Sequence, residues 1–123
     1  MSAFLLVGLG GALGSMARYG IGLALPSVGF PYATLIVNII GCFCIGLVLP
    51  TVARAEALPP ELRLLVVVGF LGGFTTFSAF GSETVALLRS GGGPAMVNIA
   101  ANVVLGLAAV MLGRTIGSLW PGQ

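Results

Sequence analysis

The chain has 123 residues, of which 58% are hydrophobic and only 7% charged, and its net charge is +2. Soluble domains carry about 25% charged residues, so this composition excludes a water-facing surface. The small positive charge forms no Lys/Arg cluster, which argues against nucleic acid as a partner. We therefore expect an all-α integral membrane protein with residues 1–123 in a single transmembrane domain.

The sequence contains no His and no Lys, which removes the commonest general base and the Schiff-base nucleophile. We expect no enzymatic activity. Its two cysteines, Cys42 and Cys44, stand at i and i+2 and so point to different faces of a helix. We expect both to be unpaired and to pack as small apolar side chains.

Four apolar segments are long enough to cross a bilayer, which takes about 20 helical residues. The third is longer than a bilayer needs, which fits a broken or tilted helix. A turn at Gly91–Pro94 separates it from the fourth. The expected spans are residues 3–25, 32–53, 62–88 and 95–119.

The arginines give little preference for one orientation in the membrane. With four spans, Arg54, Arg63 and Arg114 fall on one side, and Arg89 falls on the other with Arg18 near it. Because three against two is a weak bias under the positive-inside rule, we expect chains to insert in both senses. Antiparallel dimers of one gene product could then form.

In the first span, small residues and one cation recur every four residues, at Gly10, Gly14, Arg18 and Gly22. A stripe of this kind allows close approach of a neighbouring helix. A charge at such depth is costly unless it snorkels or pairs. Arg18 either reaches the lipid headgroups or attracts anions at a vestibule.

In the second span, Thr34, Asn38 and Cys42 share a face, and Asn38 lies near mid-span. The Asn38 amide can donate two hydrogen bonds, either as glue between helices or as a donor that lines a pore. In the fourth span, Asn98 and Asn102 share a face with small residues. They too could join helices or line a polar track.

The third span contains the segment Gly72-Gly73-Phe74-Thr75-Thr76-Phe77-Ser78-Ala79-Phe80, which is poor material for a continuous helix. A break inside a bilayer survives only where protein, a polar cavity or an ion satisfies the backbone. Carbonyls ending the first half-helix suit a small cation, and N–H groups near Thr76 to Ser78 suit an anion. This segment points to ion transport.

Phe77 and Phe80, at i and i+3, share a face of the second half-helix. Their positive ring edges can contact an anion without a formal charge, although two Phe at this spacing more often pack in a core. Glu83 lies one turn further along, where it could pair with an Arg or cap a polar route.

The segment from Gly72 to Phe80, followed by Glu83, resembles the signature of the Fluc (CrcB-type) fluoride channels. The stretches Gly10–Tyr19, Thr34–Gly41 and Asn98–Gly113 resemble the first, second and fourth helices of that family. The resemblance covers essentially the whole chain. It departs from the family at Ala79, where many members carry Thr, and at Phe74, often Leu.

The resemblance implies a dual-topology antiparallel homodimer in the inner (plasma) membrane, with two fluoride pores and a central structural Na⁺ that is not transported. Carbonyls of Gly72 and Thr75 match the Na⁺ site. The positions matching the fluoride path are Asn38, Phe77, Ser78 and Phe80. Arg18 and Glu83 match positions with less direct roles, and we place Asn98 and Asn102 with them as supporting polar residues.

Two other functions remain open from the residues alone. A small multidrug transporter would also be a four-span dimer, but it would need an ionisable group in the first spans, and neither of the first two contains an acid. A non-catalytic subunit of a larger membrane complex is the second alternative.

Overall fold

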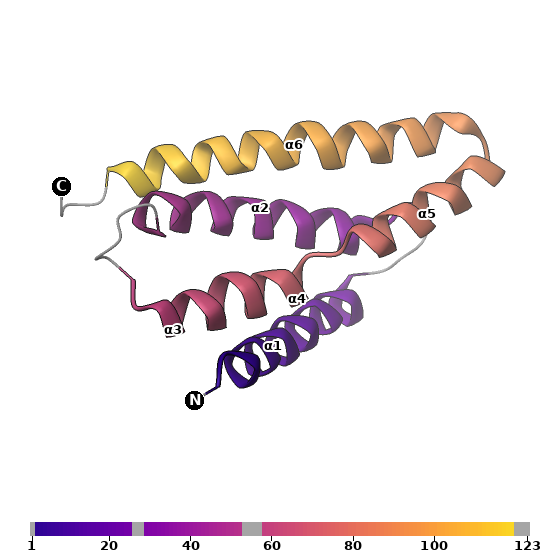
Figure 1. The fold of residues 1–123 in the computed structure, drawn as a ribbon. Helices are drawn as coiled ribbons and strands as arrows, with labels where there is room; N and C mark the ends of the chain where they lie inside the picture. Colours follow the sequence, from indigo (N-terminus) through magenta and orange to yellow (C-terminus); the bar gives the residue numbers. More distant parts are fainter. Residues whose placement is uncertain (1, 26–28, 53–57, 120–123) are drawn as a thin grey trace.

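The computed structural model describes residues 2–25, 29–52 and 58–119, and within these ranges the chain is helical apart from short turns (Figure 1). The predicted end of the second span at Ala53, and the loop residues Arg54 and Glu56, lie outside the described residues. The elements are α1 (Ala3–Ala24), α2 (Tyr32–Val52), α3 (Pro60–Arg63), the π-helical segment η1 (Leu64–Leu71), α4 (Gly72–Phe74), α5 (Phe77–Arg89) and α6 (Gly92–Ser118).

Four stretches are long and apolar enough to cross a membrane, which confirms the expected all-helical membrane fold. They are Ala3–Ala24, Tyr32–Pro50, Pro60–Arg89 and Gly92–Ser118. The third stretch joins α3, η1, α4 and α5 and has 30 residues. Its length exceeds the ~20 residues that a bilayer needs.

The helices pack mainly as two pairs. In the first pair, α2 lies along α6. In the second, α1 lies against η1 and α4. Beyond α4 the chain turns away from α1, and α5 packs against α6 (Figure 1). The third stretch therefore contacts α1 through its first half and α6 through its second half. Its middle, between α4 and α5, lies where the two pairs meet.

Glycines set the distance between α1 and its partner. A Cβ on Gly10 or Gly14 would overlap the backbone carbonyl oxygens of Leu65 and Phe70. Close backbone contact of this kind maximises van der Waals packing in a bilayer, where no hydrophobic effect joins helices. The predicted stripe is correct at these two positions but not at Gly22, because no atom of another described element lies within 4 Å of its Cβ position.

The α2–α6 pair uses the same device. A Cβ on Gly46 would overlap the carbonyl of Val110, and one on Gly113 or Gly117 would overlap backbone atoms of α2. Three of the six buried residues of α6 are the glycines Gly106, Gly113 and Gly117. The backbone of α6 therefore lies directly against that of α2, which fixes the relative height of their polar side chains.

The start of α6 differs from expectation. The sequence predicts a turn over Gly91–Pro94, but the helix begins at Gly92 and includes Pro94 in its first turn. Proline is tolerated there because the first N–H groups of a helix have no intrahelical acceptor. The turn is shorter than predicted, and Gly91 makes it with φ 123°, a conformation that favours glycine.

Replacing Gly14 by Ala should lower the free energy of unfolding by about 1–3 kcal/mol, because the added methyl overlaps backbone that cannot rotate away. Thermal unfolding in detergent, followed by circular dichroism, measures the change. Gly8→Ala is the matched control on the same helix, since no described atom outside α1 lies within 4 Å of its Cβ position. Equal effects of both substitutions would contradict the close contact.

Candidate functional site

The third stretch leaves helical geometry at two residues. Thr75 ends α4 with φ −75° and ψ 158°, and Thr76 precedes α5 with φ −150° and ψ 114°. Both conformations are extended, so the regular ladder of i to i−4 hydrogen bonds is interrupted here. The interruption lies inside a stretch that is apolar enough to cross a membrane.

Two backbone N–H groups at the interruption have side-chain acceptors. The Thr76 N–H donates to Asn38 Oδ1 (2.9 Å), and the Ala79 N–H donates to Thr76 Oγ1 (3.2 Å), an N-cap of α5. In a continuous helix these two groups would bond the carbonyls of Gly72 and Thr75. At the interruption, the Thr76 and Ala79 N–H groups bond side chains, so the carbonyls of Gly72 and Thr75 lose the donors that a continuous helix would give them.

The carbonyl of Gly73 has a charged partner. Arg18 Nε donates to it at 3.2 Å and Ser15 Oγ at 3.4 Å, both from α1. Arg18 is half-buried, and it pairs with the backbone at the end of α4. The two alternatives for Arg18, headgroups or a vestibule, did not include this partner.

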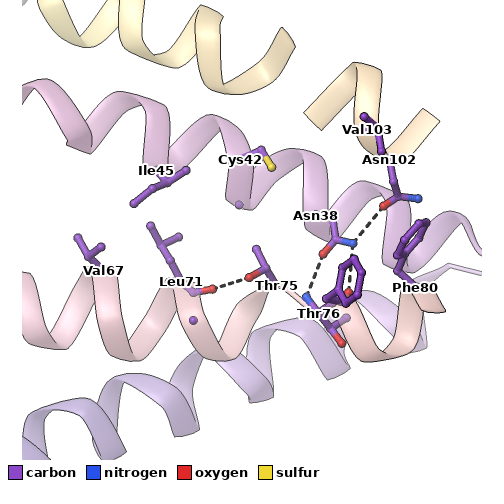
Figure 2. A pocket seen from close by; sticks show the side chains of 13 residues that line it. Asn38, Cys42, Ile45, Val67, Leu71, Thr75, Thr76, Phe80, Asn102 and Val103 are labelled. Atoms are coloured by element: carbon purple, nitrogen blue, oxygen red, sulfur yellow. Dashed lines mark hydrogen bonds between the residues drawn. The ribbon is translucent and has the colours of Figure 1, made fainter. Parts of the chain in front are cut away.

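Asn38 of α2 binds both backbone groups of Thr76 (Figure 2). Its Nδ2 donates to the Thr76 carbonyl (3.2 Å) and to Asn102 Oδ1 (3.1 Å), while its Oδ1 accepts from the Thr76 N–H. Both hydrogens of the amide are therefore engaged. Asn38 joins α2 to the interruption and to α6 at one point.

The network continues along α6 and returns to α5. Asn102 Nδ2 donates to the Asn98 carbonyl (3.0 Å) and to Asn98 Oδ1 (3.1 Å). Asn98, only 1% exposed, donates to Thr84 Oγ1 at 2.9 Å. The Thr84 hydroxyl donates to the carbonyl of Phe80 at 2.7 Å.

A cavity of about 450 Å³ opens beside the interruption. Phe77 and Phe80 both line it, with their ring centroids 5.5 Å apart, and the Phe77 side chain is 82% exposed. Figure 2 shows Phe80 beside Asn102 and Asn38. The lining is mostly apolar; its polar side chains are Asn38, Thr75, Thr76 and Asn102.

Glu83 has a partner that the sequence did not suggest. Its Oε1 accepts from Thr34 Oγ1 at 2.8 Å, which joins α5 to α2, and no Arg bonds it within the described ranges. Oε2 is buried and has no hydrogen-bond partner among the described residues. Glu83 also lines a second cavity of about 330 Å³, formed with Pro31, Leu87 and neighbouring residues.

The structure brings together six of the residues singled out from the sequence, which all line the first cavity: Asn38, Gly72, Thr75, Phe77, Phe80 and Asn102. Arg18, Glu83 and Asn98 lie outside this lining and act through hydrogen bonds. Ser78 is also outside it; the side chain is exposed, with Oγ 3.3 Å from Thr76 Oγ1.

The sequence interpretation gave the backbone near Thr76 a role in anion binding but assigned none to the side chains of Thr76 and Thr84, although both are central to the network. A hydroxyl directly before a half-helix is a typical N-cap, so Thr76 could have been recognised from its position. The role of Thr84 could not, because a Thr inside a helix ordinarily bonds its own backbone.

The fold and the site define a multi-pass membrane protein in which a polar network surrounds the extended residues Thr75 and Thr76 of the third apolar stretch. Residues 5–114 match the family described as CrcB-like protein, Camphor Resistance (CrcB). The chain is 48% identical to the "Fluoride-specific ion channel FluC" of Rhizobium etli (strain CIAT 652), covering 90% of this chain and 92% of the relative.

Two further relatives carry the same name. That of Thermus thermophilus is 46% identical over 99% of this chain and 100% of its own length. That of Prosthecochloris aestuarii (strain DSM 271 / SK 413) is 45% identical, over 97% of this chain and 95% of its own. The chain belongs to the CrcB family.

Thr76→Ala should lower the free energy of unfolding by about 0.5–2 kcal/mol, because the Ala79 N–H loses its capping oxygen. Thr76→Ser should restore most of the loss, since the hydroxyl oxygen is kept. Thr115→Ala is the control, because the exposed Thr115 hydroxyl bonds only its own helix at Met111. Thermal unfolding distinguishes the three; the cap is wrong if Thr76→Ala and Thr115→Ala behave alike.

Proposed function

We propose that this protein is a fluoride-selective channel that gives passive fluoride export across the cell membrane and so lowers cytoplasmic fluoride. The observation that carries the proposal is the cavity at the interruption, where Phe77, Phe80 and Asn38 come together. The names of the relatives support the choice of ion. Fluoride that enters as HF and dissociates inside would leave by this route.

The proposed fluoride path uses Asn38, Phe77, Ser78 and Phe80. Fluoride is small and strongly hydrated, so a pore must replace its water shell with a few hydrogen-bond donors and aromatic ring edges. Weak, multiple sites let the ion leave again, whereas a row of cations would hold it. Both hydrogens of Asn38 are engaged with Thr76 and Asn102, so a passing fluoride competes with these acceptors.

We further propose that the interruption in the third stretch is a helix break inside the membrane, and that two chains insert antiparallel to form a dual-topology homodimer. The balanced arginines permit both orientations. Gly72 and Phe77 are exposed on the single chain, beside the cavity. A second copy on this face would cover exposed backbone, which is costly in a bilayer.

A structural Na⁺ would fit between two such chains, held by the carbonyls of Gly72 and Thr75. The N–H groups that would bond these carbonyls in a helix donate instead to Asn38 and Thr76. Oxygen ligands suit a hard cation, and the carbonyl end of a half-helix carries partial negative charge. The space beside Gly72 is open among residues 2–25, 29–52 and 58–119, since no atom outside its own helix lies within 4 Å of its Cβ position there.

Arg18, Glu83, Asn98 and Asn102 have supporting roles in this proposal. Arg18 holds the end of α4 through Gly73, and Glu83 joins α5 to α2 through Thr34. The two asparagines of α6 hold Asn38. Together, residues 1–123 form one transmembrane domain.

Liposomes reconstituted with this protein alone should release fluoride and retain chloride. Phe80→Ile should reduce fluoride efflux by about tenfold or more, because the aromatic ring edge that contacts the anion is lost. Phe4→Ile, at a side chain that is 90% exposed near the start of α1, is the control and should leave efflux unchanged. Absence of fluoride flux, or equal chloride flux, would contradict the channel proposal.

Replacing Na⁺ by N-methylglucamine during purification should weaken the dimer, because the carbonyls of Gly72 and Thr75 lose their cation. Size-exclusion chromatography with light scattering measures the oligomeric state. K⁺ in place of Na⁺ tests whether the site is selective for the smaller ion. A dimer that is indifferent to all three cations would argue against a cation at the break.

A further inference from the structure

We infer that Asn98 and Asn102 are positioning residues of an amide relay that holds the start of α5, and with it Phe80, through Asn38. The effect of the relay on fluoride passage rests on the proposed function, but its effect on the backbone does not. Neither the cavity lining nor the family names assign such a role to Asn98, which contributes nothing to the cavity.

The relay is a chain of hydrogen bonds that begins at Thr76, directly before α5, and ends at Phe80, in the first turn of α5. It starts at Thr76, whose N–H and carbonyl both bond Asn38, and passes to Asn102 and then to Asn98 on α6. It returns through Thr84 to the carbonyl of Phe80. The relay therefore fixes both ends of the first turn of α5 against two other helices.

The direction of the hydrogen bonds makes the arrangement unique. Asn38 donates to Asn102, Asn102 to Asn98, Asn98 to Thr84, and Thr84 to the Phe80 carbonyl. Asn102 also donates to the Asn98 carbonyl. Reversing one amide would set donor against donor or acceptor against acceptor, which is costly for buried groups.

Because Asn98 and Thr84 are buried, the relay can transmit a change at Asn98 to residues that Asn98 does not bond directly. Asn98 is 1% exposed and Thr84 is 8% exposed, so neither can exchange its partner for water at small cost. Asn98 does not contact Asn38 by any described hydrogen bond, yet it orients Asn102, which accepts from Asn38. A substitution at Asn98 should therefore weaken the hydrogen bonds between Asn38 and the backbone of Thr76.

The test is backbone hydrogen exchange of residues 74–81 in the purified protein, followed by mass spectrometry. Asn98→Leu should speed exchange in this segment by about tenfold or more, because it removes the two side-chain hydrogen bonds of Asn98 with Thr84 and Asn102, and should leave α1 unchanged. Thr115→Val on the same helix is the matched control, because its exposed hydroxyl bonds only α6. Thr84→Val removes the last two links, the bond from Asn98 and the bond to the Phe80 carbonyl, and serves if Asn98→Leu does not fold.

A second readout concerns coupling. Asn38→Ala alone should speed exchange at residues 74–81, and adding Asn98→Leu should speed it by less than the sum of the two separate effects, because Asn98 acts partly through Asn102 and Asn38 and partly through Thr84. Faster exchange in every helix alike, additive effects of the two substitutions, or no change at residues 74–81 would each overturn the relay.

Fluoride efflux from liposomes separates this inference from the proposed function. Asn98→Leu should reduce efflux by about tenfold, matching the change in exchange. A wild-type protein that conducts no fluoride while its exchange responds to Asn98→Leu would leave the relay standing and refute the channel. A conducting wild type whose exchange is indifferent to Asn98 would refute the relay alone.

Discussion

The structure depends on one constraint: a backbone that leaves helical geometry inside an apolar stretch must find hydrogen-bond partners there. Each unsatisfied peptide group costs several kcal/mol in hydrocarbon, on the order of the whole stability of a small domain. Asn38 meets this constraint for Thr76, since one side-chain amide binds both the N–H and the carbonyl. The Thr76 hydroxyl then caps α5 by accepting from Ala79. Both backbone groups of Thr76 and the Ala79 N–H thus have partners, whereas the carbonyls of Gly72 and Thr75 are left without their helical donors.

The remaining architecture brings Asn38 to this point. Glycine contacts hold α2 against α6, at Gly46 and Gly113, so that Asn38 lies level with Asn102. A second set, at Gly10 and Gly14, holds α1 against η1 and lets Arg18 reach the carbonyl of Gly73. Because backbones in contact allow little sliding, the polar partners cannot shift by a helical turn. The glycine contacts therefore determine which polar groups meet at the interruption. The proposed ion path depends on these contacts and on the polar groups that they bring together.

Much of this fold could be predicted from the sequence, but the hydrogen-bond partners of its polar side chains could not. Hydropathy and length identify the four stretches, and Gly72 to Ser78 marks the place of the interruption, because glycines and hydroxyls are poor helix material in a bilayer. Periodicity also assigns Asn38, Asn98 and Asn102 to inward faces. It gives no relative height between helices, so the bonds of Arg18 to Gly73 and of Glu83 to Thr34 were missed. The same limit explains Gly22, which continues the stripe of α1 but has no neighbouring helix within 4 Å of its Cβ position in the described part of the chain.

The most direct test of the account is an ester in place of the peptide N–H at Thr76, introduced by chemical ligation, which removes a single donor and no side chain. If Asn38 satisfies the interruption, the ester should lower the melting temperature in the wild-type background. It should have little further effect when Asn38 is already replaced by Ala, because the bond is then absent. Equal losses in both backgrounds, or no loss in either, would contradict the claim that Asn38 holds the interrupted helix.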